Sequence, residues 1–145
     1  VEEGPFSDYS GYERLQVVIK GTGLVLVAPD HEIDLRRTFE PRRYDGGTPI
    51  RTRLENGPVE VVNLIADRAR FRTELGVGRP GTALECRPGR HVVHAPVDDA
   101  EVMVGDHHYA LPLDTALSVN TSKPVVVRIL AGIILVGSIY GATTA

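Results

Sequence analysis

The stretch from Leu15 to Ala28 reads LQVVIKGTGLVLVA and does most to decide the fold. Two runs rich in Val, Ile and Leu flank the triplet Gly21-Thr22-Gly23. Side chains of this kind favour β-strands, and glycines allow the backbone to turn sharply between them. The pattern predicts strands at Leu15–Lys20 and Leu24–Ala28, joined as a hairpin.

Strand-like runs punctuated by turns continue along the rest of the chain. They lie at Glu32–Leu35, Ile50–Leu54, Val59–Ala66, Thr82–Cys86, His91–Ala95, Glu101–Val104, His107–Leu111 and Ala116–Val119, with two more in Val125–Tyr140. The segment Asp67–Leu75 fits either a short helix or a loop followed by a strand. No segment keeps a helical period, so the chain is predicted to be all-β with little helix, a barrel or sandwich.

Composition limits the class of protein and its partners. The chain has 145 residues, of which 42% are hydrophobic and 24% charged, as in globular domains. The net charge of −3 argues against a nucleic-acid partner. Val125–Tyr140 is too short for a membrane-spanning helix and contains Arg128, so no membrane partner is expected. The polar opening VEEGPFSDYS and the single cysteine, Cys86, lead us to expect a cytoplasmic protein.

A faint internal repeat relates the two halves of the chain. A shift of 76 positions superposes Asp30-His31 on Asp106-His107, and a shift of 75 superposes Arg53 on Arg128. Shifts that differ by one residue are expected from a single loop deletion. We therefore predict two β units, 1–76 and 77–145, joined by a loop at Gly76–Gly81. The G-x-G-x-x-G pattern of that loop leads into no helix, so it is not interpreted as a phosphate-binding motif.

The stretch from Gly4 to Arg70 resembles the HutD/Ves family, which is associated with bacterial histidine utilisation. The resemblance is carried by Pro5-Phe6-Ser7, Gly11, Arg14, Gly21, Gly23, Phe39-Glu40-Pro41, Tyr44-Asp45-Gly46, Pro49, Leu54, Gly57-Pro58, Asn63-Leu64 and Arg68. It implies a bicupin, in which one chain forms two cupin-like, jelly-roll antiparallel β-barrels. Family members usually begin with a Trp-Lys-Asn-Gly-Gly-Gly-Thr-Thr-like segment. The present chain starts just ahead of Pro5 without it, so we expect the pocket description to be incomplete.

Two polar residues are the main candidates for binding a ligand. In VEVVNLIA, Asn63 shares a strand face with Val61 and Ile65, where a buried amide needs hydrogen-bond partners. Such an amide either satisfies a backbone group or contacts a ligand, and the family resemblance favours the second interpretation. Arg14, at the entry to LQVVIK, also matches a family position. Together they suit a small anionic, amide-bearing or imidazole-bearing metabolite.

Five further residues complete the predicted ligand site. Phe6, Phe39 and Tyr44 could supply its apolar walls, with core packing an equal alternative for both phenylalanines. Glu40 and Arg53 belong to the same predicted set. For most arginines between Arg36 and Arg53, a solvated face balanced by nearby acids is the better interpretation.

The histidines do not follow the pattern of metal-binding cupins. Those proteins need two histidines one residue apart, because alternate residues of a strand share a face. Here the spacings are His91-x-x-His94 and His107-His108, so no metal and no cofactor are predicted. His107 and His108 are weak acid/base candidates, although a polar hairpin end explains them more simply. We interpret Cys86 as a buried structural thiol.

The leading functional hypothesis is a small-molecule-binding protein of histidine degradation. The resemblance implies a ligand such as urocanate or formylglutamate, bound for regulation or scavenging, with its carboxylate at Arg14 and a polar group oriented by Asn63. One alternative is a cupin-type isomerase or hydrolase that uses His107 or His108. Another is a structural cupin that forms a homodimer through sheet edges.

Overall fold

The computed structural model describes residues 4–5 and 8–141. In this part of the chain every regular element is a β-strand, and no helix is long and apolar enough to cross a membrane. Contacts divide the chain into two compact units, Val1–Arg70 and Phe71–Ala145. The predicted all-β class is confirmed.

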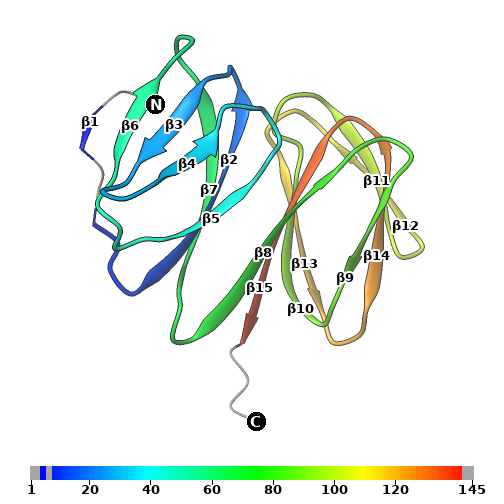
Figure 1. Ribbon diagram of the computed structural model, residues 1–145. Coiled ribbons are helices and arrows are strands. Elements are labelled where there is room, and N and C mark those ends of the chain that lie inside the picture. The colour runs from blue at the N-terminus through cyan, green and yellow to red at the C-terminus, as the bar shows by residue number, and fades with distance from the viewer. Residues whose placement is uncertain (1–3, 6–7, 142–145) are drawn as a thin grey trace. The chain divides into compact units, whose positions relative to one another are not determined.

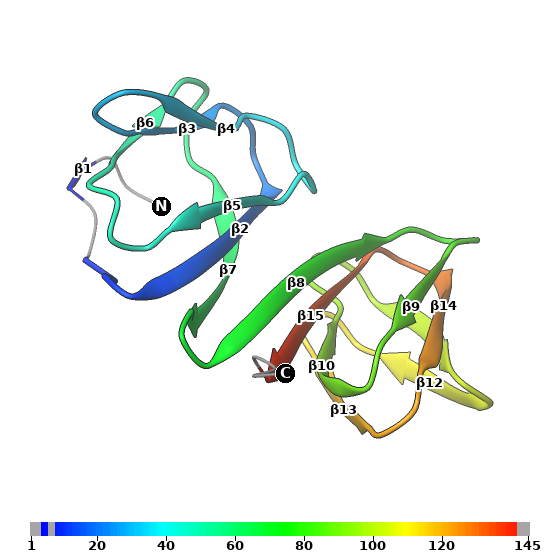
Figure 2. The ribbon, with the colours of Figure 1, turned by 60° about the horizontal axis from the view of Figure 1, so that its bottom comes forward.

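The first unit consists of two antiparallel sheets that face each other (Figures 1 and 2). One sheet has the order β1 (Gly4–Pro5), β6 (Arg51–Leu54), β3 (Leu24–Val27), β4 (Glu32–Leu35). The other has the order β5 (Arg42–Asp45), β2 (Tyr12–Lys20), β7 (Glu60–Asp67). Their inner faces bury one hydrophobic core, which includes Val18, Leu24, Leu26, Ile33 and Leu35.

The predicted hairpin between the first two strands is wrong. β2 pairs with β5 and β7, whereas β3 pairs with β4 and β6. Gly21 and Gly23, with φ angles of 83° and 88°, lead the chain from one sheet to the other. The physical reason is burial. Both strands are apolar, and they face each other across the core instead of pairing side by side in one sheet. The hairpin forms one step later, between β3 and β4.

The second unit repeats this plan with one more strand. Its sheets have the orders β13 (Ala116–Thr121), β10 (Gly89–His94), β15 (Ile134–Gly141), β8 (Phe71–Gly78) and β12 (His107–Leu111), β11 (Ala100–Val104), β14 (Val125–Ala131), β9 (Ala83–Cys86). Val93, Val102, Ile129 and Ile134 lie in its core. β8 has no counterpart among the described strands of the first unit.

Matching registers relate the two units residue by residue. β2 lies between β5 and β7 as β10 lies between β13 and β15. Gln16 is paired with Asn63 in the first unit, and His91 with Ser138 in the second. Both members of these pairs differ by the 75-residue offset seen in the sequence. The repeat therefore places equivalent polar side chains on the inner faces of both units.

The first half of the expected loop at Gly76–Gly81 is strand. β8 runs from Phe71 to Gly78, which settles the alternatives left open for Asp67–Leu75, and the chain leaves the first unit at the turn formed by residues 67–70. Glycine is needed in this strand for packing rather than for a turn. A Cβ atom on Gly78 would lie 2.5 Å from the Cδ1 atom of buried Ile129.

Gly78→Ala is expected to lower the free energy of unfolding by about 1–3 kcal/mol, because overpacking forces a fully buried neighbour to move. The matched control is Gly76→Ala on the same strand face, where the added Cβ would sit at an ordinary 3.5 Å from Leu84. Urea unfolding of both variants measures the difference. Equal stabilities of the two variants would contradict the packing explanation.

Candidate ligand-binding site in the first unit

Arg14 is a charged side chain buried on the inner face of β2. Strand alternation places Arg14, Gln16 and Val18 on one face, and Val18 belongs to the core. Arg14 is only 9% exposed and Gln16 only 5%. Removing a guanidinium from water is costly unless other groups replace its hydration, so the neighbours of Arg14 must supply polar or cation–π contacts.

Among the described residues, Asn63, Tyr9 and Tyr44 contact the Arg14 guanidinium. Its Nη2 atom donates a hydrogen bond to the Oδ1 atom of Asn63 at 3.0 Å. The central guanidinium carbon lies 5.2 Å from the ring centroid of Tyr9 and 5.1 Å from that of Tyr44. Both distances fit cation–π attraction. The cation is thus held between two aromatic rings, with a polar contact to β7.

Tyr44 connects the guanidinium to a second buried polar group. It lies opposite Arg14 in the β2–β5 register, and its hydroxyl donates to the Oε1 atom of Gln16 at 2.6 Å. Burial raises the pKa of Tyr44 to about 12, although the positive charge of Arg14 acts in the opposite direction. Tyr44 is therefore a neutral hydrogen-bond donor at physiological pH. We call Tyr9, Arg14, Gln16, Tyr44 and Asn63 the Arg14 cluster.

The Arg14 cluster reaches solvent at Asn63. In the part of the first unit that the structure describes, β7 forms one edge of its sheet, and Asn63 is exposed although it is paired with buried Gln16. Its neighbours Val61 and Ile65 are half-buried. A molecule approaching along this edge would meet Asn63 first and the guanidinium behind it.

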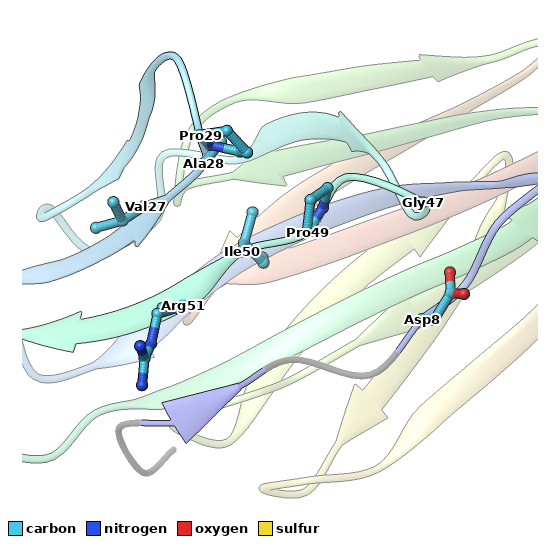
Figure 3. A pocket seen from close by; sticks show the side chains of 8 residues that line it. All are labelled: Asp8, Val27, Ala28, Pro29, Gly47, Pro49, Ile50 and Arg51. Atoms are coloured by element: carbon cyan, nitrogen blue, oxygen red, sulfur yellow. The ribbon is translucent and has the colours of Figure 1, made fainter.

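A cavity of about 740 Å³ opens in the same unit (Figure 3). Its described lining consists of Asp8, Val27, Ala28, Pro29, Gly47, Pro49, Ile50 and Arg51. Ala28 and Ile50 belong to the same core cluster as Tyr44, so the floor of the cavity is part of the packed interior. The volume falls within the range of small-molecule sites.

The structure brings together three of the residues predicted to bind a ligand. Arg14, Asn63 and Tyr44 lie in one cluster. Glu40 is instead within ion-pair distance of two surface arginines, and Arg53 pairs with Glu32 and Glu55. Phe39 is half-buried in a turn, where its amide donates to the carbonyl of Val18 and its φ is 58°. Phe6 lies outside the described residues.

Sequence reasoning missed Gln16, Tyr9 and the cavity residues Asp8 and Arg51. The period of two in YERLQVVIK could have identified Gln16, because it places this residue on the same face as Arg14. No comparable signal exists for Tyr9 or Asp8. They precede β2, and backbone hydrogen bonds from Tyr9 to Gly46 and from Tyr12 to Tyr9 place them against the first unit.

Four of the five histidines lie in the second unit, and His31 lies in the first. His91 is 1% exposed and hydrogen-bonds to Ser138 and to the carbonyl of Arg87, while His94 contacts Asp114. His107 and His108 are exposed on β12, and His108 lies 3.5 Å from Glu101. Among residues 4–5 and 8–141, no three side chains of the kinds that ligate metals lie together.

Cys86 belongs to the hydrophobic core of the second unit. Its thiol is buried, and burial raises the pKa of this thiol, with the charge of Glu74 acting in the same direction. A raised pKa keeps the sulfur protonated and weakly nucleophilic. The environment of Cys86 therefore suits a structural thiol.

Tyr44→Phe is expected to destabilise the chain by about 1–3 kcal/mol at neutral pH, because the buried Oε1 atom of Gln16 loses its donor. The effect should shrink as the pH rises above 10. There the phenol ionises in the unfolded chain, while folded Tyr44, with its pKa of about 12, stays protonated. This ionisation lowers the free energy of unfolding of the wild type but not that of the variant, which has no phenol. Urea unfolding at several pH values measures the difference. A pH-independent difference would contradict the raised pKa.

Comparison with known proteins gives the family. The family model described as HutD matches residues 1–132. An uncharacterised 21.2 kDa protein encoded in the hutC 3′ region of Pseudomonas putida is 28% identical over 74 residues, which are 51% of this chain and 39% of that protein.

Two solved structures share the fold over nearly the whole chain. A conserved protein of unknown function from Pseudomonas aeruginosa PAO1 has a TM-score of 0.83 at 18% identity, covering 97% of this chain and 78% of that one. HutD from Pseudomonas fluorescens SBW25 has a TM-score of 0.78 at 24% identity, covering 98% and 75%. The two-sheet units are cupin-like barrels, and the bicupin fold is confirmed. The resemblance seen in the sequence is likewise confirmed, and the chain belongs to the HutD family.

Proposed function

We propose that the first unit binds a small anionic metabolite through the Arg14 cluster. The observation that carries this proposal is the buried guanidinium of Arg14, held between Tyr9 and Tyr44 and bonded to exposed Asn63. A fixed, partly desolvated cation beside a solvent-accessible amide is a suitable receptor for a carboxylate. Because the surrounding rings hold the cation in place, little side-chain entropy is lost on binding.

The chemistry of the cluster suggests how a ligand would be oriented. A guanidinium presents its N–H groups in a planar fork that matches the two oxygens of a carboxylate. The Asn63 amide accepts from Arg14 through Oδ1, and its NH₂ group can donate to a second polar atom of the ligand. Tyr9 and Tyr44 would lie beside the carboxylate end. A ligand bearing one carboxylate and one nearby acceptor satisfies these requirements.

Family membership narrows the candidates to metabolites of histidine utilisation. The protein is a cupin-type member of a family associated with that pathway, which favours an intermediate such as urocanate or formylglutamate. The solved HutD of Pseudomonas fluorescens SBW25 is described in a formate condition, and formate is the simplest carboxylate. Binding would serve regulation or scavenging of the intermediate in the cytoplasm, the compartment that the single cysteine favours.

The enzyme alternative has less support. It relies on His107 and His108, which are exposed side chains on β12 of the second unit rather than parts of an enclosed site. General acid/base catalysis requires the reacting group to be held within hydrogen-bond reach of the catalytic side chain. The binding function is therefore the better proposal.

Arg14→Lys is expected to weaken carboxylate binding at least about tenfold, because an ammonium group cannot reproduce the bidentate fork. Titration calorimetry with formate, urocanate and formylglutamate measures the dissociation constants. The control is Arg37→Lys, a conservative change at a side chain that is 82% exposed. Equal affinities of the wild type and Arg14→Lys for all three compounds would overturn the assignment to Arg14.

Asn63→Asp provides a test that keeps Arg14 and replaces Asn63 by a side chain of similar size. The new carboxylate would form an ion pair with Arg14 and occupy the place proposed for the ligand, so binding should be lost while the variant stays folded. Circular dichroism and thermal unfolding establish folding, and the same calorimetric titration establishes binding. Undiminished affinity in a folded Asn63→Asp variant would contradict the proposed position of the ligand.

A further inference from the structure

The cavity of the first unit has features of a second binding site, separate from the Arg14 cluster. Among the residues that the structure describes along its wall, neither Arg14 nor Asn63 is present. We propose that this cavity binds an elongated small molecule with a carboxylate at one end, an N–H-bearing cationic group at the other, and an apolar body between them.

The middle of the cavity is apolar and rigid. Val27, Ala28 and Pro29 come from the end of β3 and its turn, and Pro49 and Ile50 come from the approach to β6. Ile50 is 4% exposed and is packed in the core. Two prolines restrict the backbone of the wall, so the surface is preformed rather than assembled on binding. An apolar ligand body would bury carbon surface against it.

Arg51 supplies a cation at one end of this wall. It differs from Arg53, its neighbour on the same face of β6, which pairs with Glu32 at 3.1 Å and Glu55 at 3.1 Å. Within residues 4–5 and 8–141, no carboxylate lies within ion-pair distance of Arg51, which is exposed and lines the cavity. In a unit whose other arginines are mostly ion-paired, this guanidinium is available to an external anion.

Asp8 supplies a carboxylate at the other end. The backbone bond from Tyr9 N to Gly46 O, at 3.0 Å, fixes Asp8 beside the turn that contains Gly47. Its Oδ1 atom accepts from the amide and hydroxyl of Ser10, and its Oδ2 atom has no bond within the described part of the chain. Figure 3 shows Asp8 and Arg51 at opposite ends of the lining, with Pro49 and Ile50 between them.

The spacing of the two charges sets the class of ligand. Arg51 lies four positions after Gly47, and an extended stretch of that length spans at most about 13 Å. A single small anion would neutralise Arg51 but leave the wall and Asp8 uncovered. A zwitterion with its charges at opposite ends matches Arg51, the apolar wall and Asp8 together, so both ends contribute to recognition.

The test uses 4-(aminomethyl)benzoate, which carries a carboxylate, an aromatic body and an ammonium group. Amide ¹H–¹⁵N NMR titration of the full chain should show saturable shifts at Gly47, Ile50 and Arg51. Two probes that each lack one charge, 4-methylbenzoate and 4-methylbenzylamine, should bind at least about tenfold more weakly. Arg51→Gln and Asp8→Asn should weaken the zwitterion by a similar factor, whereas Arg37→Gln should not.

Several results would overturn the proposal. They are the absence of saturable shifts at Gly47 and Arg51 in the wild type, equal affinities for the zwitterion and 4-methylbenzoate, or unchanged affinity in Arg51→Gln. The side-chain amide signal of Asn63 reports separately on the Arg14 cluster. Carboxylate-dependent shifts at Asn63 without shifts at Gly47 would support the proposed function and reject the cavity site. Shifts at Gly47 without shifts at Asn63 would support the cavity site and reject the proposed function.

Discussion

The organisation of the first unit depends on burying one positive charge on the inner face of a sheet. Arg14 is 9% exposed, on a strand whose next inward-facing residues are Gln16 and the core residue Val18. Tyr9, Tyr44 and Asn63 replace part of the hydration that this cation loses on burial. A protein selected for stability alone would gain by placing an apolar side chain at this position. This buried charge is the observation on which the proposed binding function rests.

The second unit shows what the same position becomes without such a charge. His91 and Ser138 occupy the places of Gln16 and Asn63 and bond to each other at 2.7 Å. The carbonyl of Arg87 can only accept, so the Nε2 atom of His91 donates to it. Where the first unit has Arg14, the repeat has Gly89, whose added Cβ would lie 2.6 Å from the Tyr140 ring. The second unit thus fills the position with its own side chains, which is why we propose the binding function for the first unit.

Much of the fold could be predicted from local sequence, but the connections between strands could not. Alternation and turn residues identified most strands, and the repeat identified two similar units. The predicted strand pairing was wrong at Gly21–Gly23, because a short glycine turn can either close a hairpin or lead the chain from one sheet to the other. Which of the two forms depends on how the apolar side chains of both strands are buried, and this is decided by the whole core. Gly78 was misleading because the strand needs glycine there to pass Ile129, so this glycine marks close packing rather than a loop.

The candidate site was predictable where its residues lie in strands. Arg14, Asn63 and Tyr44 converge because register places them on one face. Family resemblance pointed to Arg14 and Asn63, strand period added support for Asn63, and Tyr44 was expected only as an apolar wall. Arg53 and Glu40 were predicted to bind a ligand but form surface ion pairs instead. Their partners come from loops and neighbouring strands, which the sequence pattern does not show. Asp8, Tyr9 and Arg51 became apparent only through the cavity and the turns that place them.

The most direct measurement of the central claim is an NMR titration that observes the Arg14 guanidinium itself. Adding formate to the ¹⁵N-labelled full chain should shift the Arg14 Nε–H signal and the Asn63 side-chain amide together, with one saturating concentration dependence. Both shifts should follow the same dissociation constant as calorimetry. If the Arg14 and Asn63 signals stay fixed while calorimetry reports carboxylate binding, the ligand binds elsewhere and the buried guanidinium is structural.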